Sequence, residues 1–301
     1  MKINLILLLL IIVITCEAQK VDNTFDASIS NPKYSKGNGP NVLFDAGHHN
    51  FVIEMGAINA LADLARSDGY QIKIDSMRFT NAYLSDYRII VIMPAMPFKF
   101  GSKKEVTDEI TFQQEELNAL YDWVNKGGSL LMLSEHAPID RSMTPLFNKF
   151  GIKLSIGIVS DSLNSDTIPK LLAYTRLKYT RNNGLLNTKH PITKGEKNNE
   201  KINNILTYGG SGLTGKAYSN ILKLSNTATI KKWNGITPSG TANSQCLAGK
   251  FGKGKVVALG DCNGFTAMYF TVDEKRVQAG MQTKEYDWRQ FALNTFHWLS
   301  L

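Results

Sequence analysis

The chain has 301 residues, of which 43% are hydrophobic and 20% are charged. This length allows one large domain or two small ones, and the composition excludes a globally disordered chain. The net charge is +8, but the lysines are scattered and no basic helix appears. We therefore interpret the excess charge as a solvated surface and expect no nucleic-acid partner.

The N-terminus predicts a targeting segment. Lys2 precedes an apolar run from 3 to 14, which has the length of a signal-peptide core and is too short to span a membrane. The small residues in Cys16-Glu17-Ala18 favour cleavage before Gln19, with 1–18 as the signal peptide. The alternative is lipid attachment at Cys16. Both alternatives predict export. Cleavage before Gln19 would release the protein into the periplasm or the medium, and lipid attachment at Cys16 would anchor it to a membrane.

Residues 19–40 are polar and contain Gly, Pro and Asn, which predicts a flexible tether before a domain over 41–301. Strands are predicted at 41–45, 70–74, 87–93 and 129–133, because these segments are apolar and bounded by turn signals. Between them, one helix ends at Gly69, and a second helix, capped by Thr111 with Gln114, ends at Gly127. This alternation predicts an α/β fold with a flavodoxin-like, mostly parallel sheet and helices on both faces.

The region from about 160 to 245 is less regular and predicts a β-rich insertion. After it, 245–251 and 255–260 predict a hairpin that places Cys246 opposite Leu259. Cys262 then falls on the other face, which argues against a disulfide with Cys246. A last helix around 288–299 carries apolar residues at helical spacing and is expected to cover the sheet.

Polar side chains gather directly after three of the predicted strands. The candidate residues are Asp45, His48, His49 and Asn50 after the first strand, Ser134, Glu135 and His136 after the fourth, and Asp261 and Asn263 after the last. Ligands of open parallel sheets bind outside the carboxyl ends of the strands. If these strands are neighbours, we expect the three groups to form one site.

Histidines together with carboxylates supply groups for acid–base catalysis or for holding a divalent metal ion. We assign catalytic roles to His48, Glu135 and His136. We assign ligand-binding roles to Asp45, His49, Asn50, Asp261 and Asn263. The candidate ligands of a divalent metal are His48, His49, Glu135 and His136. Each of these residues also fits an ordinary role in a helix cap or turn, and a structural role is favoured for His190 and His297.

The segments 41–50, 86–92, 120–133, 252–261 and 294–299 resemble the class I glutamine amidotransferase-like superfamily. The resemblance covers about 41–160 and 245–301 and is nearest to an uncharacterised, often exported branch. ThuA-type domains and β-galactosidase trimerisation domains are more distant relatives. True amidotransferases place a cysteine on the turn after the strand that here ends at Leu133, where this chain reads Ser134-Glu135-His136. Glutamine hydrolysis is therefore not supported.

Three functions fit these observations. The favoured one is an exported domain that binds a small polar molecule, such as a saccharide, at the carboxyl ends of the strands. The second is a hydrolase that uses His48, His49, Glu135, His136 and Asp261, with or without a divalent metal. The third is an envelope-anchored module that contacts other envelope proteins, which lipidation at Cys16 would favour.

Overall fold

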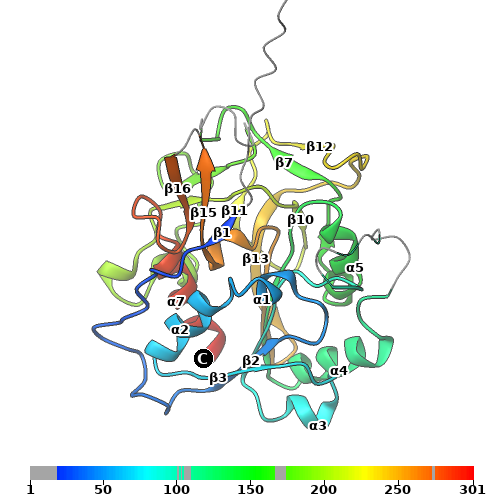
Figure 1. Ribbon diagram of the computed structural model, residues 1–301, viewed down its shortest axis with the longest axis vertical. Helices are drawn as coiled ribbons and strands as arrows, with labels where there is room; N and C mark the ends of the chain where they lie inside the picture. Colours follow the sequence, from blue (N-terminus) through cyan, green and yellow to red (C-terminus); the bar gives the residue numbers. More distant parts are fainter. Residues whose placement is uncertain (1–18, 100–101, 103, 105–109, 167–173, 273–274) are drawn as a thin grey trace, which may run out of the picture.

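A nine-stranded mixed sheet, with helices on both faces, forms the centre of the protein (Figure 1). The computed structural model describes residues 19–99, 102, 104, 110–166, 174–272 and 275–301. The predicted signal peptide and the lipid attachment at Cys16 lie outside the described residues. In the part of the chain that is described, no helix combines the length and apolar character that a membrane span requires.

One half of the sheet is parallel and has the strand order β3-β2-β4-β5-β14. These strands are β2 (Asn41–Asp45), β3 (Gln71–Asp75), β4 (Ile89–Ile92), β5 (Ser129–Leu133) and β14 (Gly254–Leu259). Every residue of β4 and β5 is buried, as expected for parallel strands that are covered on both faces. All five lie within a few residues of the strands that the sequence predicts.

The other half of the sheet is antiparallel, so the sheet is mixed and the predicted parallel arrangement holds for one half of it. Its strands are β13 (Ser244–Phe251), β10 (Leu213–Thr214), β6 (Lys153–Leu154) and β11 (Ser219–Lys223). Three of these strands come from or border the expected insertion, which therefore extends the main sheet. The predicted hairpin is confirmed: β13 pairs with β14, with Cys246 opposite Leu259. Cys246 and Cys262 are free and buried.

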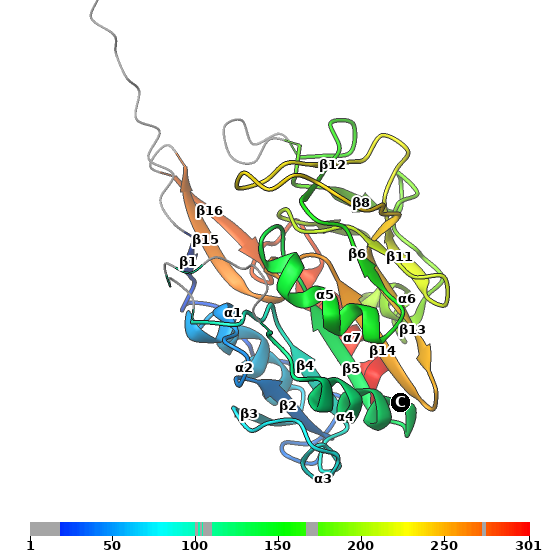
Figure 2. The same ribbon diagram turned by 90° about the vertical axis from the view of Figure 1, so that its right-hand side faces the viewer.

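Helices α2 (Asn59–Ser67) and α7 (Trp288–Ser300) cover one face of the sheet, and α4 (Gln114–Asn125) and α5 (Ile139–Lys149) cover the other (Figures 1 and 2). A hydrophobic core lies on each face of the sheet, and successive side chains of β2 point into alternate cores. Val42 and Phe44 face α7, while Leu43 belongs to the core on the opposite face. Helix α4 begins later than predicted. Its N-terminus is capped by Glu116, whose carboxylate accepts a hydrogen bond from the backbone amide of Gln113 at 3.2 Å, and not by the predicted Thr111.

The remaining elements are short and surround this frame. They are α1 (Phe51–Glu54), α3 (Asn81–Leu84), α6 (Pro191–Lys194), the pairs β7 (Ile158–Ser160) with β12 (Thr229–Lys231) and β8 (Lys178–Thr180) with β9 (Asn204–Leu206), and the single turns 198–200 and 263–265. His190 caps α6, and the Nε2 atom of His297 lies 2.6 Å from the Asp68 carboxylate. Both histidines therefore have the structural roles that the sequence favours.

The segment 19–40 differs from the expected tether, because it lies against the domain. Its strand β1 (Lys20–Val21) pairs with β15 (Ala267–Val272), which in turn pairs with β16 (Lys275–Gly280). The side chains of Phe25, Ile29 and Tyr34 pack on the main core. The apolar residues are too widely spaced for a periodic signal, so the sequence did not reveal this packing.

We expect Leu131→Ala in β5 to lower the free energy of unfolding by about 2–5 kcal/mol, because it opens a cavity in a core with no exposed surface. Leu163 is 75% exposed, so the same substitution there is expected to change stability by no more than about 0.5 kcal/mol. Urea unfolding of the two variants checks this prediction. Equal losses would contradict the placement of β5 at the centre of the sheet.

Candidate functional site

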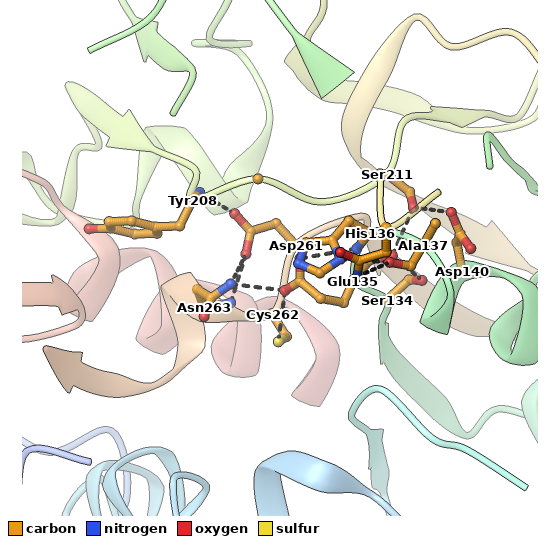
Figure 3. A network of polar contacts seen from close by, with 12 residues as sticks. Ser134, Glu135, His136, Ala137, Asp140, Tyr208, Ser211, Asp261, Cys262 and Asn263 are labelled. Atoms are coloured by element: carbon orange, nitrogen blue, oxygen red, sulfur yellow. Dashed lines mark hydrogen bonds and ion pairs between the residues drawn. The ribbon is translucent and has the colours of Figure 1, made fainter. Parts of the chain in front are cut away.

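Two of the three predicted groups of polar residues meet at the carboxyl edge of the sheet. Strands β5 and β14 are parallel neighbours, with Leu133 opposite Leu259, so Glu135 and Asp261 leave the sheet side by side. Asn263 joins them: its side-chain amide donates to Glu135 Oε2 at 2.9 Å and to Asp261 Oδ1 at 3.1 Å (Figure 3). We call Glu135 and Asp261 the carboxyl pair.

Glu135 is 3% exposed and is surrounded by donors. Its Oε2 atom accepts from the Cys262 thiol at 3.2 Å, and its Oε1 atom accepts from the His136 backbone amide at 3.1 Å. Burial raises the pKa of Glu135 to about 7, although the hydrogen bonds from His136 and Cys262 oppose this rise. The thiol of Cys262 is itself fully buried, so it holds the carboxyl group and offers no accessible nucleophile.

Asp261 is equally buried and accepts from the backbone amides of Tyr208 and Asn263. Burial, reinforced by the charge of Glu135, raises the pKa of Asp261 to about 7. The two groups repel each other when both are ionised, so they lose their protons as a coupled pair. The carboxyl pair therefore changes charge close to neutral pH, where an isolated Asp or Glu would be ionised.

His136 is the member of the cluster that reaches the surface, with a quarter of its side chain exposed. Its Nδ1 atom lies 3.0 Å from the Ala137 carbonyl, which can only accept, so the ring proton belongs on Nδ1 and Nε2 is left as an acceptor. Burial lowers the pKa of His136, which favours the neutral ring. The ring packs on the indole of Trp233, with 5.0 Å between centroids.

A third carboxyl group, Asp140, lies in the first turn of α5 and was not singled out in the sequence. Its Oδ2 atom accepts from the Gly157 amide at 2.7 Å, and burial raises its pKa to about 6. Ser211, 3.5 Å from the same oxygen, also donates to the Glu135 carbonyl at 2.8 Å. Ser211 thereby ties α5 to the end of β5.

Ser211 belongs to the glycine-rich run 208–212, which crosses the ends of β5 and β14. A Cβ atom on Gly210 would lie 2.2 Å from the Gly260 carbonyl, so the close approach of the two backbones requires glycine there. The density of glycines was the signal that the sequence offered for this crossing. The run lies between strands β9 and β10, so it lacks the strand-to-helix setting of a phosphate loop.

The first predicted group does not join this cluster. The Nδ1 atom of His48 lies 2.9 Å from Asp45, and its Nε2 atom lies 3.4 Å from Glu116, with the aromatic rings of Phe79 and Phe112 on the ring faces. His49 pairs with Glu54 on the surface, and Asn50 caps α1. The predicted single site is therefore wrong, because β4 lies between β2 and β5 in the sheet.

The predicted metal ligands are divided in the same way. Glu135 and His136 belong to the carboxyl-pair cluster, whereas His48 contacts Glu116 and His49 contacts Glu54. Within the described ranges, no group of three or more His, Cys, Asp or Glu side chains is arranged to hold a metal ion. A metal centre made from His48, His49, Glu135 and His136 is therefore not formed.

Comparison with known proteins supports the fold. No protein-family model and no curated protein matches the sequence. The N-terminal domain of mmIFT52 is similar with a TM-score of 0.57 and 15% identity, over 86% of this chain and 96% of that domain.

Two ThuA-like proteins also match, each with a TM-score of 0.44. The protein from Bacteroides uniformis is 13% identical, over 90% of this chain and 93% of its own. The protein from Parabacteroides merdae is 12% identical, over 87% and 90%. The similarity to the mmIFT52 domain supports the mixed α/β fold and nothing beyond the fold.

The contacts of His48 predict a pH-dependent stability. Burial opposes the charged ring, but Asp45 and Glu116 outweigh it and raise the pKa of His48 to about 9. Because the pKa of His48 is higher in the folded protein than in the unfolded chain, protonation of His48 stabilises the fold. This stabilisation is complete at pH values below about 6.5, the pKa in the unfolded chain, and is lost as the pH rises through about 9. We expect His48→Gln to cost about 3 kcal/mol at pH 6 and much less at pH 9.5.

Urea unfolding at the two pH values measures this difference. His49→Gln is the matched control, because its ion pair with Glu54 is exposed and contributes less than about 1 kcal/mol. A cost for His48→Gln that is the same at both pH values would contradict a charged His48 between the two carboxylates.

Proposed function

We propose that this chain binds a small polar molecule, with a neutral saccharide as the class, at the carboxyl ends of β5 and β14. The observation that carries the proposal is the pair of rings, His136 and Trp233, at the surface of the buried carboxyl cluster. Saccharide sites combine an aromatic face, which contacts the CH groups of the sugar, with a few fixed polar groups that bind hydroxyls.

The polar groups needed for such a ligand are available. Nε2 of His136 is an acceptor, because Nδ1 is engaged by the Ala137 carbonyl. The indole Nε1 of Trp233 is buried and has no hydrogen-bond partner within the described residues. A buried donor without an acceptor is costly, and a hydroxyl oxygen of a bound ligand would remove that cost.

The proposal includes two further expectations, one about the fold and one about the location of the protein. The strand order β3-β2-β4-β5-β14 favours a flavodoxin-like parallel half, whose ligand site lies at the carboxyl ends of the strands. Export, through the predicted signal peptide or with lipid at Cys16, would place the site in the periplasm or outside the cell.

The test is intrinsic fluorescence titration with glucose, galactose, N-acetylglucosamine, maltose, cellobiose and lactose. We expect at least one of these sugars to give a saturable change for the unmodified protein, because Trp233 would contact it. His136→Ala is expected to weaken binding at least tenfold, and Trp233→Phe should abolish the fluorescence change.

The chain offers a matched control, because His190 packs on Trp298 with the same 5.0 Å between ring centroids, away from the carboxyl pair. His190→Ala should leave the titration unchanged. If none of the sugars binds to the folded protein, or if both histidine variants weaken binding equally, the proposal fails.

A hydrolase is the second candidate, and the perturbed groups favour it. Three carboxyl groups with raised pKa values surround a histidine whose neutral Nε2 can accept a proton from water. Nε2 lies 3.9 Å from Glu135 Oε1, so a proton accepted by His136 would be stabilised when Glu135 is ionised. In this role His136 is the general base and Glu135 is a positioning residue.

If the chain is a hydrolase, p-nitrophenyl glycosides or p-nitrophenyl acetate should release nitrophenol. We expect His136→Ala to lower the rate at least about 100-fold, the usual contribution of a general base. Burial lowers the pKa of His136, but Glu135, whose pKa is raised to about 7, acts only when ionised, so the rate of the unmodified protein should still rise as the pH passes through about 7. His190→Ala is again the control, and an unchanged rate in His136→Ala would contradict this candidate.

A further inference from the structure

The ring of Tyr208 points away from the carboxyl pair (Figure 3). While the backbone amide of Tyr208 donates to Asp261, its ring lies under the guanidinium of Arg176, 5.5 Å from the ring centroid. Arg176 lines a cavity of about 560 Å³. The polar groups around this cavity include Asp166, Arg276, Thr283, Glu285 and Tyr286.

Arg176 is 5% exposed but is not fully paired. Its Nη2 atom lies 3.3 Å from Asp166, whereas Nε and Nη1 have no hydrogen-bond partner in the described part of the chain. A buried guanidinium with unsatisfied donors is costly, and its planar fork matches a carboxylate. Arg176 therefore lines the cavity as a cation with two donors, Nε and Nη1, that lack an acceptor among the described residues.

Arg276 supplies a second cation, and its position is fixed. Its Nη2 atom pairs with Asp22 Oδ1 at 2.7 Å, and its guanidinium stacks on Tyr269 at 3.7 Å from the ring centroid. A side chain that is already held in place loses little entropy when a ligand binds. Arg176 and Arg276 thus place two positively charged side chains, both held by other contacts, in the lining of the cavity.

The carboxylates of Asp166 and Glu285 line the same cavity. They repel any anion, a dianion such as phosphate about twice as strongly as a single carboxylate, and they accept hydrogen bonds from hydroxyl groups. The hydroxyls of Thr283 and Tyr286 add groups of the same kind. These neighbours select a ligand with one carboxylate and several hydroxyls.

We propose that the cavity between Arg176 and Arg276 binds a sugar acid, with the carboxylate of the ligand on the two arginines and its hydroxyls toward Asp166 and Glu285. The volume is within the range of small-molecule sites. This site is separate from the one at His136 and takes a charged ligand, so the two proposals stand or fall independently.

Isothermal titration of the purified protein with D-glucuronate tests the proposal, with D-glucose and inorganic phosphate as comparison ligands. Saturable binding of glucuronate, at least tenfold tighter than that of glucose or phosphate, is the expected result. Arg176→Met and Arg276→Met should each weaken glucuronate binding at least tenfold, because each removes one of the two cations.

Circular dichroism establishes which variants are folded, and Arg276→Met decides the matter if Arg176→Met does not fold, since Arg276 is half-exposed. Arg66→Met removes an exposed arginine that pairs with Asp63 on α2, and His136→Ala alters the other site. Both should bind glucuronate as the unmodified protein does.

Three results would overturn the proposal: no saturable glucuronate binding, equal or tighter binding of glucose or phosphate, or folded arginine variants that bind unchanged. Loss of glucuronate binding in His136→Ala would also overturn it, because the ligand would then occupy the site at the ends of β5 and β14.

Discussion

The parallel pairing of β5 with β14 is the constraint on which the candidate site depends. With Leu133 opposite Leu259, the chain leaves the sheet at two adjacent points, and a buried carboxyl group follows each of them. Neither strand alone would bring Glu135 near Asp261. The hairpin between β13 and β14 fixes this register from the other side, since it holds β14 along its whole length.

Two buried acidic groups repel each other when ionised, and the hydrogen-bond donors that surround them hold them together. Asn263 contacts both, Cys262 and the His136 amide hold Glu135, and the Tyr208 amide holds Asp261. These donors come from the two strand ends and from the glycine-rich crossing. The fold thus maintains groups that retain protons near neutral pH, next to a histidine that reaches the surface.

Much of the frame could be predicted from the sequence, because β2, β4, β5 and β14 are apolar runs bounded by turn residues. Glu135, His136, Asp261 and Asn263 could be chosen because they directly follow such runs. The order of the strands does not follow from these runs, so the expectation that the group around His48 joins the site is wrong. Strands of two residues, such as β6 and β10, carry no period to detect. Trp233 lies on a turn far away in sequence, where only the folded chain shows that it meets His136.

Cys246 and Cys262, the thiols within the described residues, can report motions of this protein. Cys246 lies inside the sheet and Cys262 at its carboxyl edge, and neither has exposed surface. A thiol reagent reaches either sulfur only when the surrounding structure opens. The difference between the two labelling rates therefore separates local opening of the strand ends from unfolding of the whole sheet, with no reporter group introduced.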